Sequence, residues 1–516
     1  MKPSYTLSAS LGTGNINLAT KAKQVEAWLA QIQGYDVPER VTLLTAYLSE
    51  HDRPDLPAAF RRQILDLAGP QVGALLRNLE PVLRDLPLPM GDGQRKQVDA
   101  VILLMLAVGG MNKRLIVEFA EYTPRLFGSN PLPIHIAGFL NSARQLLDIC
   151  YISHSQIPDG FWRDLHQTAQ LIFAADLVEA ADPTGKAPSL IATYTAMVLE
   201  AIADPYHFAE QERLWLHDVI KRLGPLAKVE DARSPSHKGV YGIRIAEDKV
   251  PYPLAWQKGT EPDCELVLNT TGPARKLALA ISRIEQGRYD EQAMPMLRHP
   301  AYKALLQRLK LLWGGSMRRT TPRRVPVQPV RPRLMLGFHA IHKYLAGSFE
   351  ALDEGSIISG RVINESLGGM ALVVQKPNFH LKVGTLVFIS RGADGTFRDL
   401  GMIRWFRTRP DGVLTFGVKF LRGRADCVTV FSGDGRHVYP GVLVAKENGT
   451  SGNGPMAGSG KLVLPPVRLA ANSRVEIRHE GLQSIWLLTE KLEGLNDIDL
   501  FRCQSDRNGQ TGATPG

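Results

Sequence analysis

The spacing of apolar residues changes along the chain, and this change constrains the fold more than any other feature. From Asn17 to Lys228, apolar residues recur every three or four positions, which is the period of an amphipathic helix. After Val325 the period becomes two, in short runs separated by Gly, Pro, Asp and Asn, which is typical of β-strands joined by turns. The sequence therefore predicts a large all-α N-terminal region followed by antiparallel β-structure.

The N-terminal region is expected to contain eight helices, near residues 19 to 33, 39 to 50, 57 to 78, 94 to 126, 136 to 152, 158 to 181, 187 to 203 and 204 to 223. In the last of these, Asp204 can cap the helix, Pro205 suits the first turn and Gly224 can end it. The helices show no fixed repeat period. An irregular helical bundle or a helical-hairpin array is the predicted architecture.

A mixed segment follows the helical region. Val229 to Gly239 is interpreted as a linker because it contains Ser, Pro, His and Gly in close succession. Strands are expected at 240 to 245 and 265 to 268, and helices near 273 to 286 and 300 to 312. Gly314 and Gly315 end the last helix, and their conformational freedom predicts a hinge at this point.

The C-terminal part contains many short runs of period two. They lie at 356 to 363, 370 to 374, 385 to 389, 400 to 405 and 413 to 420, and many short strands at close spacing favour a barrel. Further strand-like runs at 442 to 444, 461 to 464, 474 to 477 and 484 to 488 predict a small additional β module or an extension of the barrel.

With 516 residues, the chain is too long for one ordinary hydrophobic core, so a multidomain α+β protein is expected. The predicted parts are a helical effector domain (1 to 228), a mixed linker or subdomain (229 to 315), a barrel (316 to 435), a small β module (436 to 505) and a disordered tail (506 to 516).

The composition is ordinary for a globular protein, with 44% hydrophobic and 22% charged residues. The longest apolar run, Val101 to Val108, is far shorter than the roughly 20 residues of a spanning helix. The N-terminus lacks the apolar stretch of a secretory signal. We therefore expect a cytoplasmic protein with no membrane span, and its four dispersed cysteines are expected to be reduced.

Two short motifs carry the chemistry of ligand binding. Arg319-Thr-Thr-Pro-Arg323 lies in an arginine-rich segment, and between Met317 and Lys343 no acidic residue occurs. Arginine offers a planar fork that binds phosphate or the O6/N7 edge of guanine with two hydrogen bonds. The second motif is Asn364-Glu-Ser-Leu-Gly-Gly369, in which an amide and a hydroxyl can bond to a base or to an oxygen, and a glycine permits close backbone approach.

The pairing of RxxxR with (D/N)xSxxG resembles the signature of PilZ domains, which bind the bacterial second messenger cyclic di-GMP. The later runs Gly401-Met-Ile-Arg-Trp405 and Gly417-Val-Lys-Phe420 resemble two further strand motifs of that family, in the same order. The resemblance covers roughly residues 317 to 432 and implies an antiparallel β-barrel.

The resemblance also implies the residues that bind the nucleotide. These are Arg319, Arg323, Asn364, Ser366 and Gly369, with secondary contacts from Arg318 and Arg324. The segment Leu334 to Gly355 is longer than the first strand and turn usual for the family, and it is expected to form a helix or an altered strand pair.

Other sites have weaker support in the sequence. No HExxH, GxSxG or acid/base pair is visible, so the chain is not expected to be an enzyme. His339 and His342 share a helical spacing but lack an acidic or cysteine partner nearby, so no metal site and no cofactor are predicted. His207 and His217 are interpreted as surface or interface residues.

The predicted function is that of a cyclic di-GMP receptor whose nucleotide reorients a helical region that binds an unidentified protein partner. An alternative from another class is a non-enzymatic scaffold or adaptor. Its basic barrel surface would bind protein or RNA without cyclic di-GMP, and a steep dependence of RNA affinity on salt would favour it.

Overall fold

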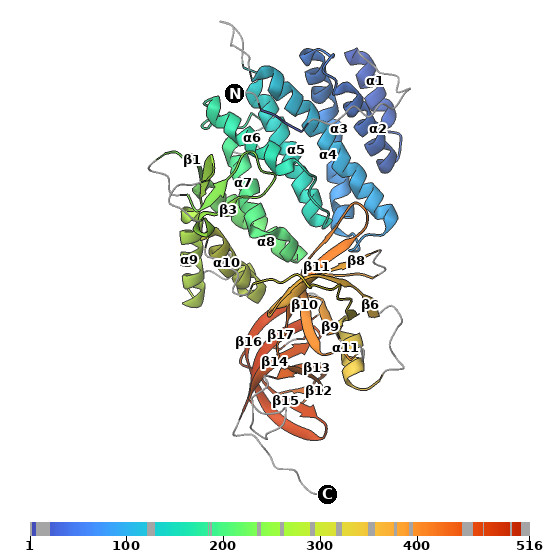
Figure 1. Ribbon diagram of the computed structural model, residues 1–516, viewed down its shortest axis with the longest axis vertical. Coiled ribbons are helices and arrows are strands. Elements are labelled where there is room, and N and C mark those ends of the chain that lie inside the picture. The colour runs from blue at the N-terminus through green and yellow to red at the C-terminus, as the bar shows by residue number, and fades with distance from the viewer. Residues whose placement is uncertain are drawn as a thin grey trace. The chain divides into compact units, whose positions relative to one another are not determined.

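The protein is described from a computed structural model (Figure 1). The described residues are 3–6, 21–120, 130–183, 185, 188–234, 239–257, 263–288, 295–315, 322–348, 357–375, 379–391, 396–445, 458–467, 469–495 and 498–506. The chain forms two compact units. One contains Met1–Pro205, Leu214–Ser282 and Gln307–Met317, and the other contains Tyr206–Arg213, Arg283–Leu306 and Arg318–Gly516.

Helices fill the described part of residues 22 to 223, as the helical period predicts. They are α1 (Ala22–Ile32), α2 (Val37–His51), α3 (Ala58–Arg84), α4 (Asp92–Phe119), α5 (Leu132–Ile152), α6 (Phe161–Ala174), α7 (Leu190–Ala203) and α8 (Glu210–Leu223). Leu104, Met111 and Leu115 of α4 and Ile136 and Leu140 of α5 are at most 1% exposed, so these two helices form much of the core. The all-α N-terminal region is confirmed.

The start of the last helix in this region differs from the prediction. Asp204 does not cap α8; its positive φ of 56° ends α7, and Pro205 begins a 3-10 turn at Pro205–His207. Helix α8 begins only at Glu210, where the Glu212 carboxylate accepts a hydrogen bond of 2.8 Å from the Ala209 N–H. That bond satisfies a donor that the helix itself leaves free, which explains the later start.

Helix α4 is the only helix among the described residues that is long and apolar enough to cross a bilayer, judged by length and composition alone. Of its most apolar 18-residue window, 67% is buried within the protein. The core helix of a globular domain meets the same criterion, so this observation is weak evidence for a membrane span.

Charged groups inside the helical region are paired. The Lys113 ammonium on α4 lies 2.8 Å from the Asp164 carboxylate on α6, and their side chains are only 9% and 4% exposed. Asp164 also accepts a 3.0 Å hydrogen bond from the Thr6 N–H. The pair therefore ties α4, α6 and the N-terminal segment together, because a buried charge is stable only when a partner compensates it.

A loop from the following subdomain caps α6. The Asp248 carboxylate accepts hydrogen bonds from the backbone N–H groups of Gly160 (2.6 Å) and Trp162 (2.8 Å), which are donors that the start of α6 leaves free. Next to it, His166 is fully buried between the Tyr194 hydroxyl and the Lys249 carbonyl, each 2.8 Å away. Because a carbonyl can only accept, Nε2 of His166 carries the proton and Nδ1 accepts from Tyr194.

A four-stranded antiparallel sheet of order β1-β4-β2-β3 follows, built from β1 (Lys228–Asp231), β2 (Tyr241–Ile243), β3 (Tyr252–Pro253) and β4 (Leu266–Asn269). The predicted strands correspond to β2 and β4, and the predicted helices to α9 (Thr271–Glu285) and α10 (Pro300–Trp313). The linker prediction for Val229 to Gly239 is wrong at its start, because Lys228–Asp231 pairs with β4 along its whole length. Four residues are too few to show a period.

The end of α10 is anchored in the first unit. Trp313 is fully buried, and its indole N–H donates to the Leu199 carbonyl over 3.2 Å. Gly315 follows with a φ of 66°, a conformation that favours glycine. The Gly314–Gly315 pair thus lies directly before Met317, where the first unit ends.

A seven-stranded antiparallel sheet carries both later strand motifs. Its order is β6-β5-β9-β10-β11-β8-β7, with β5 (Arg333–Leu336), β6 (Ile357–Ser359), β7 (Arg361–Ser366), β8 (Gly369–Val374), β9 (Leu386–Ser390), β10 (Asp399–Thr408) and β11 (Leu414–Phe420). The two edge strands β6 and β7 are consecutive in the chain and are separated only by Gly360. One bent segment therefore pairs with both ends of the sheet, and the sheet curls back on itself.

The two strand motifs meet in this sheet through a glycine. Trp405 of β10 pairs with Gly417 of β11, and a Cβ at position 417 would overlap the Trp405 indole. Only glycine leaves room for the ring at this crossing. The two motifs are thus two halves of one packing arrangement.

The closed barrel lies farther along the chain than predicted. It consists of β12 (Arg424–Ser432), β13 (Val438–Ala445), β14 (Ser459–Leu464), β15 (Arg474–His479), β16 (Leu482–Leu495) and β17 (Ile498–Ser505), in the order β12-β13-β14-β17-β16-β15. Its interior is filled by buried side chains such as Trp486, Phe501 and Ile477. The predicted boundary after residue 435 falls inside this barrel, since β12 pairs with β13 and β15.

The segment Leu334 to Gly355 forms, in its described part, most of β5 and the helix α11 (Phe338–Leu345). Phe338 and Ile341 of α11 are buried in a cluster that also contains Leu386 and Leu400 of the sheet and Val442 of the barrel. The inserted helix therefore packs the curled sheet against the closed barrel.

Candidate functional site

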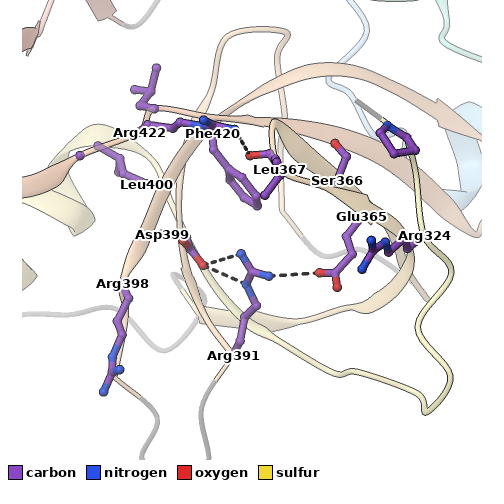
Figure 2. A pocket seen from close by; sticks show the side chains of 13 residues that line it. Arg324, Glu365, Ser366, Leu367, Arg391, Arg398, Asp399, Leu400, Phe420 and Arg422 are labelled. Atoms are coloured by element: carbon purple, nitrogen blue, oxygen red, sulfur yellow. Dashed lines mark hydrogen bonds and ion pairs between the residues drawn. The ribbon is translucent and has the colours of Figure 1, made fainter. Parts of the chain in front are cut away.

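A pocket of about 530 Å³ opens where the β7–β8 turn, the β9–β10 connection and the end of β11 meet (Figure 2). The residues that line it are Pro322, Arg324, Glu365, Ser366, Leu367, Arg391, Arg398, Asp399, Leu400, Phe420, Leu421, Arg422 and Gly423. The volume lies in the range of small-molecule sites.

The β7–β8 turn contains the Asn-x-Ser-x-x-Gly motif, and its serine holds the turn together. The Ser366 hydroxyl donates to the Gly369 carbonyl and accepts from the Gly368 N–H, both over 3.3 Å. A side chain at Gly369 would overlap the Val418 carbonyl of β11, so only glycine permits β8 to approach β11 here. The Gly368 carbonyl in turn accepts from the Phe420 N–H over 3.0 Å.

The arginine-rich segment reaches this turn by backbone pairing. Arg324 and Glu365 exchange two backbone hydrogen bonds of 2.7 and 2.8 Å and form an isolated antiparallel bridge. The bridge places Arg324 at the wall of the pocket, and its side chain is exposed. It also fixes the end of the RxxxR segment against β7.

Arg391 lies at the centre of an ion-pair network across the pocket (Figure 2). Its guanidinium lies 2.7 Å from the Asp399 carboxylate and 3.1 Å from the Glu365 carboxylate, and its Cζ lies 5.2 Å from the centre of the Phe420 ring. All three charged side chains are more than a third exposed, at 35% for Arg391 and 38% for each acid. Each such pair is worth at most about 1 kcal/mol, so the network can be exchanged for other partners.

Arg422 supports the turn from the opposite wall. Its guanidinium donates to the Leu367 carbonyl over 2.9 Å. The pocket is lined by four arginines, namely Arg422, Arg324, Arg391 and Arg398, and by two carboxylates, those of Glu365 and Asp399. The pocket therefore has a formal excess of two positive charges, which suits a dianionic ligand.

The structure brings together only part of the predicted site. Ser366 and Arg324 line the pocket, whereas Gly369 does not line it and instead permits β8 to approach β11. Asn364 is half-buried on β7 and is not one of the lining residues, while Arg323 is exposed beside Arg324. Arg318 and Arg319 lie outside the described residues.

The sequence motifs did not reveal Arg391, Arg398, Arg422, Glu365 or Asp399 as lining residues. Three of them flank strand ends: Arg391 follows β9, Arg398 precedes β10, and Arg422 follows β11. Charged residues directly after a strand are a usable signal. Which strand ends meet, however, depends on the sheet order.

Comparison with known families concerns the other end of the chain. Residues 23–235 match the family described as cyclic-di-GMP receptor FimW, N-terminal domain. No curated protein matches the chain. The match covers the described helices α2 to α8, most of α1 and strand β1.

Proposed function

We propose that the protein is a non-enzymatic, cytoplasmic receptor of the PilZ type, and that cyclic di-GMP binds in the pocket at the β7–β8 turn. Two separate parts of the chain support the same ligand. The N-terminal helices match a domain of a cyclic-di-GMP receptor, while the C-terminal part of the sequence contains the RxxxR and Asn-x-Ser-x-x-Gly motifs. The observation that carries the proposal is that Arg324 and Ser366, one from each motif segment, line a single pocket.

The charge of the pocket fits this nucleotide. Cyclic di-GMP carries two phosphodiester charges, which equal the formal excess of the four arginines over the two carboxylates. Arginine binds phosphate and the O6/N7 edge of guanine through its fork. The N1–H and N2–H edge of guanine needs a hydrogen-bond acceptor. The carboxylates of Glu365 and Asp399, which both pair with the Arg391 guanidinium, can supply one.

Binding proceeds by exchange of partners in the Arg391 network. A phosphate replaces Glu365 beside Arg391, and the released carboxylate accepts from the N1–H and N2–H groups of a guanine. The exposed pair given up is worth at most about 1 kcal/mol, whereas each new charge-assisted hydrogen bond contributes about 1.5 to 3 kcal/mol. The exchange is therefore favourable.

The remaining predicted contacts complete the site. Arg319 and Arg323 clamp phosphate and guanine, Arg318 serves as a secondary contact, and Asn364 binds from β7. Contacts between the ligand and the arginine segment shift the conformational equilibrium of the protein only if the ligand-free conformation lacks these contacts. Since Gly314 and Gly315 lie just before the arginines, ordering of the segment reorients the helical region toward a protein partner.

Isothermal titration calorimetry with cyclic di-GMP tests the site. Arg391→Ala, Arg319→Ala and Ser366→Ala are each expected to weaken binding about 10- to 100-fold, because each removes a charge-assisted bond or loosens the turn. Arg436→Ala is the matched control, since this arginine is 82% exposed on the β12–β13 turn outside the pocket. Its affinity should stay within about twofold of the wild type.

Cyclic di-AMP is the ligand control because it keeps both phosphodiesters and lacks the guanine edge. It is expected to bind at least about tenfold more weakly. Absence of cyclic di-GMP binding by the wild type, or equal affinity of all variants, would contradict the proposal. RNA binding that falls steeply with salt and ignores the nucleotide would support the adaptor alternative.

A further inference from the structure

Three ligand-type side chains from three helices meet inside the first unit. Asp148 comes from α5, Glu200 from α7 and His217 from α8. Their ligand atoms all lie within 4.8 Å of one another. Nε2 of His217 is 3.5 Å from the Glu200 carboxylate and 4.0 Å from Oδ1 of Asp148.

These distances are close to those of a coordination sphere. Zinc binds imidazole nitrogen and carboxylate oxygen at about 2.0 to 2.2 Å, so neighbouring ligand atoms of a tetrahedral site lie about 3.4 Å apart. The His217–Glu200 distance already has this value, and the His217–Asp148 distance needs to shorten by roughly half an ångström. The ligand atoms of Asp148 and Glu200 lie within 4.8 Å of each other, so this pair approaches by up to roughly 1.4 Å, through side-chain torsions.

The surroundings of the two carboxylates also point to a cation. The Glu200 side chain is 4% exposed, and Oδ1 of Asp148 is inaccessible to solvent and accepts no hydrogen bond. Two carboxylates held this close in a poorly solvated place repel each other unless a positive charge lies between them.

We propose that Asp148, Glu200 and His217 form a binding site for a divalent transition-metal ion such as Zn²⁺. One imidazole and two carboxylates supply three protein ligands and leave a fourth position for water, as open zinc sites do. The His217 side chain is 35% exposed and so provides the entry path. The ion joins α5, α7 and α8 and stabilises the helical unit.

The full-length protein, stripped with a chelator, is titrated with Zn²⁺ in a calorimeter, and Co²⁺ is added in parallel as a spectroscopic probe. We expect one ion per chain with a dissociation constant below about 10 µM. Because the ligands are nitrogen and oxygen, the Co²⁺ complex should show weak visible bands and no thiolate charge-transfer band. Bound zinc should also raise the melting temperature.

His217→Gln and Glu200→Gln should each weaken Zn²⁺ binding by at least about tenfold. The control is Asp218→Asn, the exposed neighbour of His217 on the same helix, which should bind as the wild type does. If Glu200→Gln fails to fold, His217→Gln decides the question because its side chain is partly exposed. No stoichiometric Zn²⁺ binding, binding unaffected by His217→Gln, or a thiolate band with Co²⁺ would overturn the proposal and leave a simple ion-pair cluster.

Discussion

Replacement of Gly369 by alanine tests how the binding motif is built. The motif glycine was predicted to allow approach of the ligand, whereas the structure uses it to allow approach of β11. The atoms nearest to a Cβ at position 369 are the carbonyl and Cα of Val418 and Lys419, all in the backbone. Backbone cannot rotate away as a side chain can, so β8 and β11 must separate at this end.

The expected cost of Gly369→Ala is about 1 to 3 kcal/mol, the usual penalty for forcing an extra methyl into a packed site. Gly368→Ala is the matched control. A Cβ at 368 meets nothing within 4 Å, so that variant should be neutral or more stable by about 0.4 to 1 kcal/mol. Two adjacent residues of one turn are thus expected to respond in opposite directions.

Hydrogen exchange followed by mass spectrometry measures the loss of stability at β8 and β11 separately from the rest of the chain. A global unfolding curve would average over both units. Peptides that cover β8 and β11 should exchange about 5- to 150-fold faster in Gly369→Ala, and at the wild-type rate or slower in Gly368→Ala. Peptides from the helical unit should not change. Cyclic di-GMP affinity should fall with Gly369→Ala, because Phe420 and Leu421 at the end of β11 line the pocket. Equal exchange in both variants would refute the packing argument.

Three further outcomes follow from the helical unit. Asp164→Ala should lower the free energy of unfolding, measured in urea, by about 3 to 5 kcal/mol, because it leaves the Lys113 ammonium buried without a partner. Asp411→Ala is the control: it breaks an exposed ion pair and should cost under about 1 kcal/mol. Asp248→Ala should lower stability by about 0.5 to 2 kcal/mol through loss of the α6 cap, as thermal unfolding would show, and Asp248→Asn should recover part of it. Burial lowers the pKa of His166 from 6.5 to about 4, so the folded state resists protonation of this side chain. The free energy of unfolding should therefore fall as the pH drops from 6.5 toward 4, by up to about 1.4 kcal/mol per pH unit. A His166→Gln variant whose stability has the same pH slope would contradict this.

The helices and most strands could be predicted from the sequence because each depends on a local pattern. The helical period identified each of the eight α-helices that the structure describes between residues 22 and 223, with errors confined to their ends, as at Asp204. Strands without a clear alternation were missed, namely β1, β3, β12 and β17. β1, for example, is stabilised by β4, which is distant in the sequence, and its own four residues do not show that partner.

The residues of the candidate site also fall into two groups: those that belong to local sequence patterns and those whose role depends on tertiary packing. Ser366, which belongs to a motif, and Arg324, which directly follows one, were predicted from the sequence and line the pocket. Arg391 and Asp399 were not predicted, since their role depends on β9 and β10 lying beside the β7–β8 turn. His217 was interpreted as a surface or interface residue, and only helix packing places it beside the buried Glu200 and the partly exposed Asp148.

By itself, the sequence determined the kinds of element and their order: a helical region, then antiparallel β-structure with the Asn-x-Ser-x-x-Gly motif at a turn. It could do so because hydrophobic period, turn residues and motif spacing act over a few residues. Only the tertiary structure decided which strand ends form the pocket and which helices share a charged cluster. Those outcomes depend on burial and pairing between segments that are distant in the sequence. The local sequence around a charged residue does not show whether its side chain will lie in solvent or in a pocket.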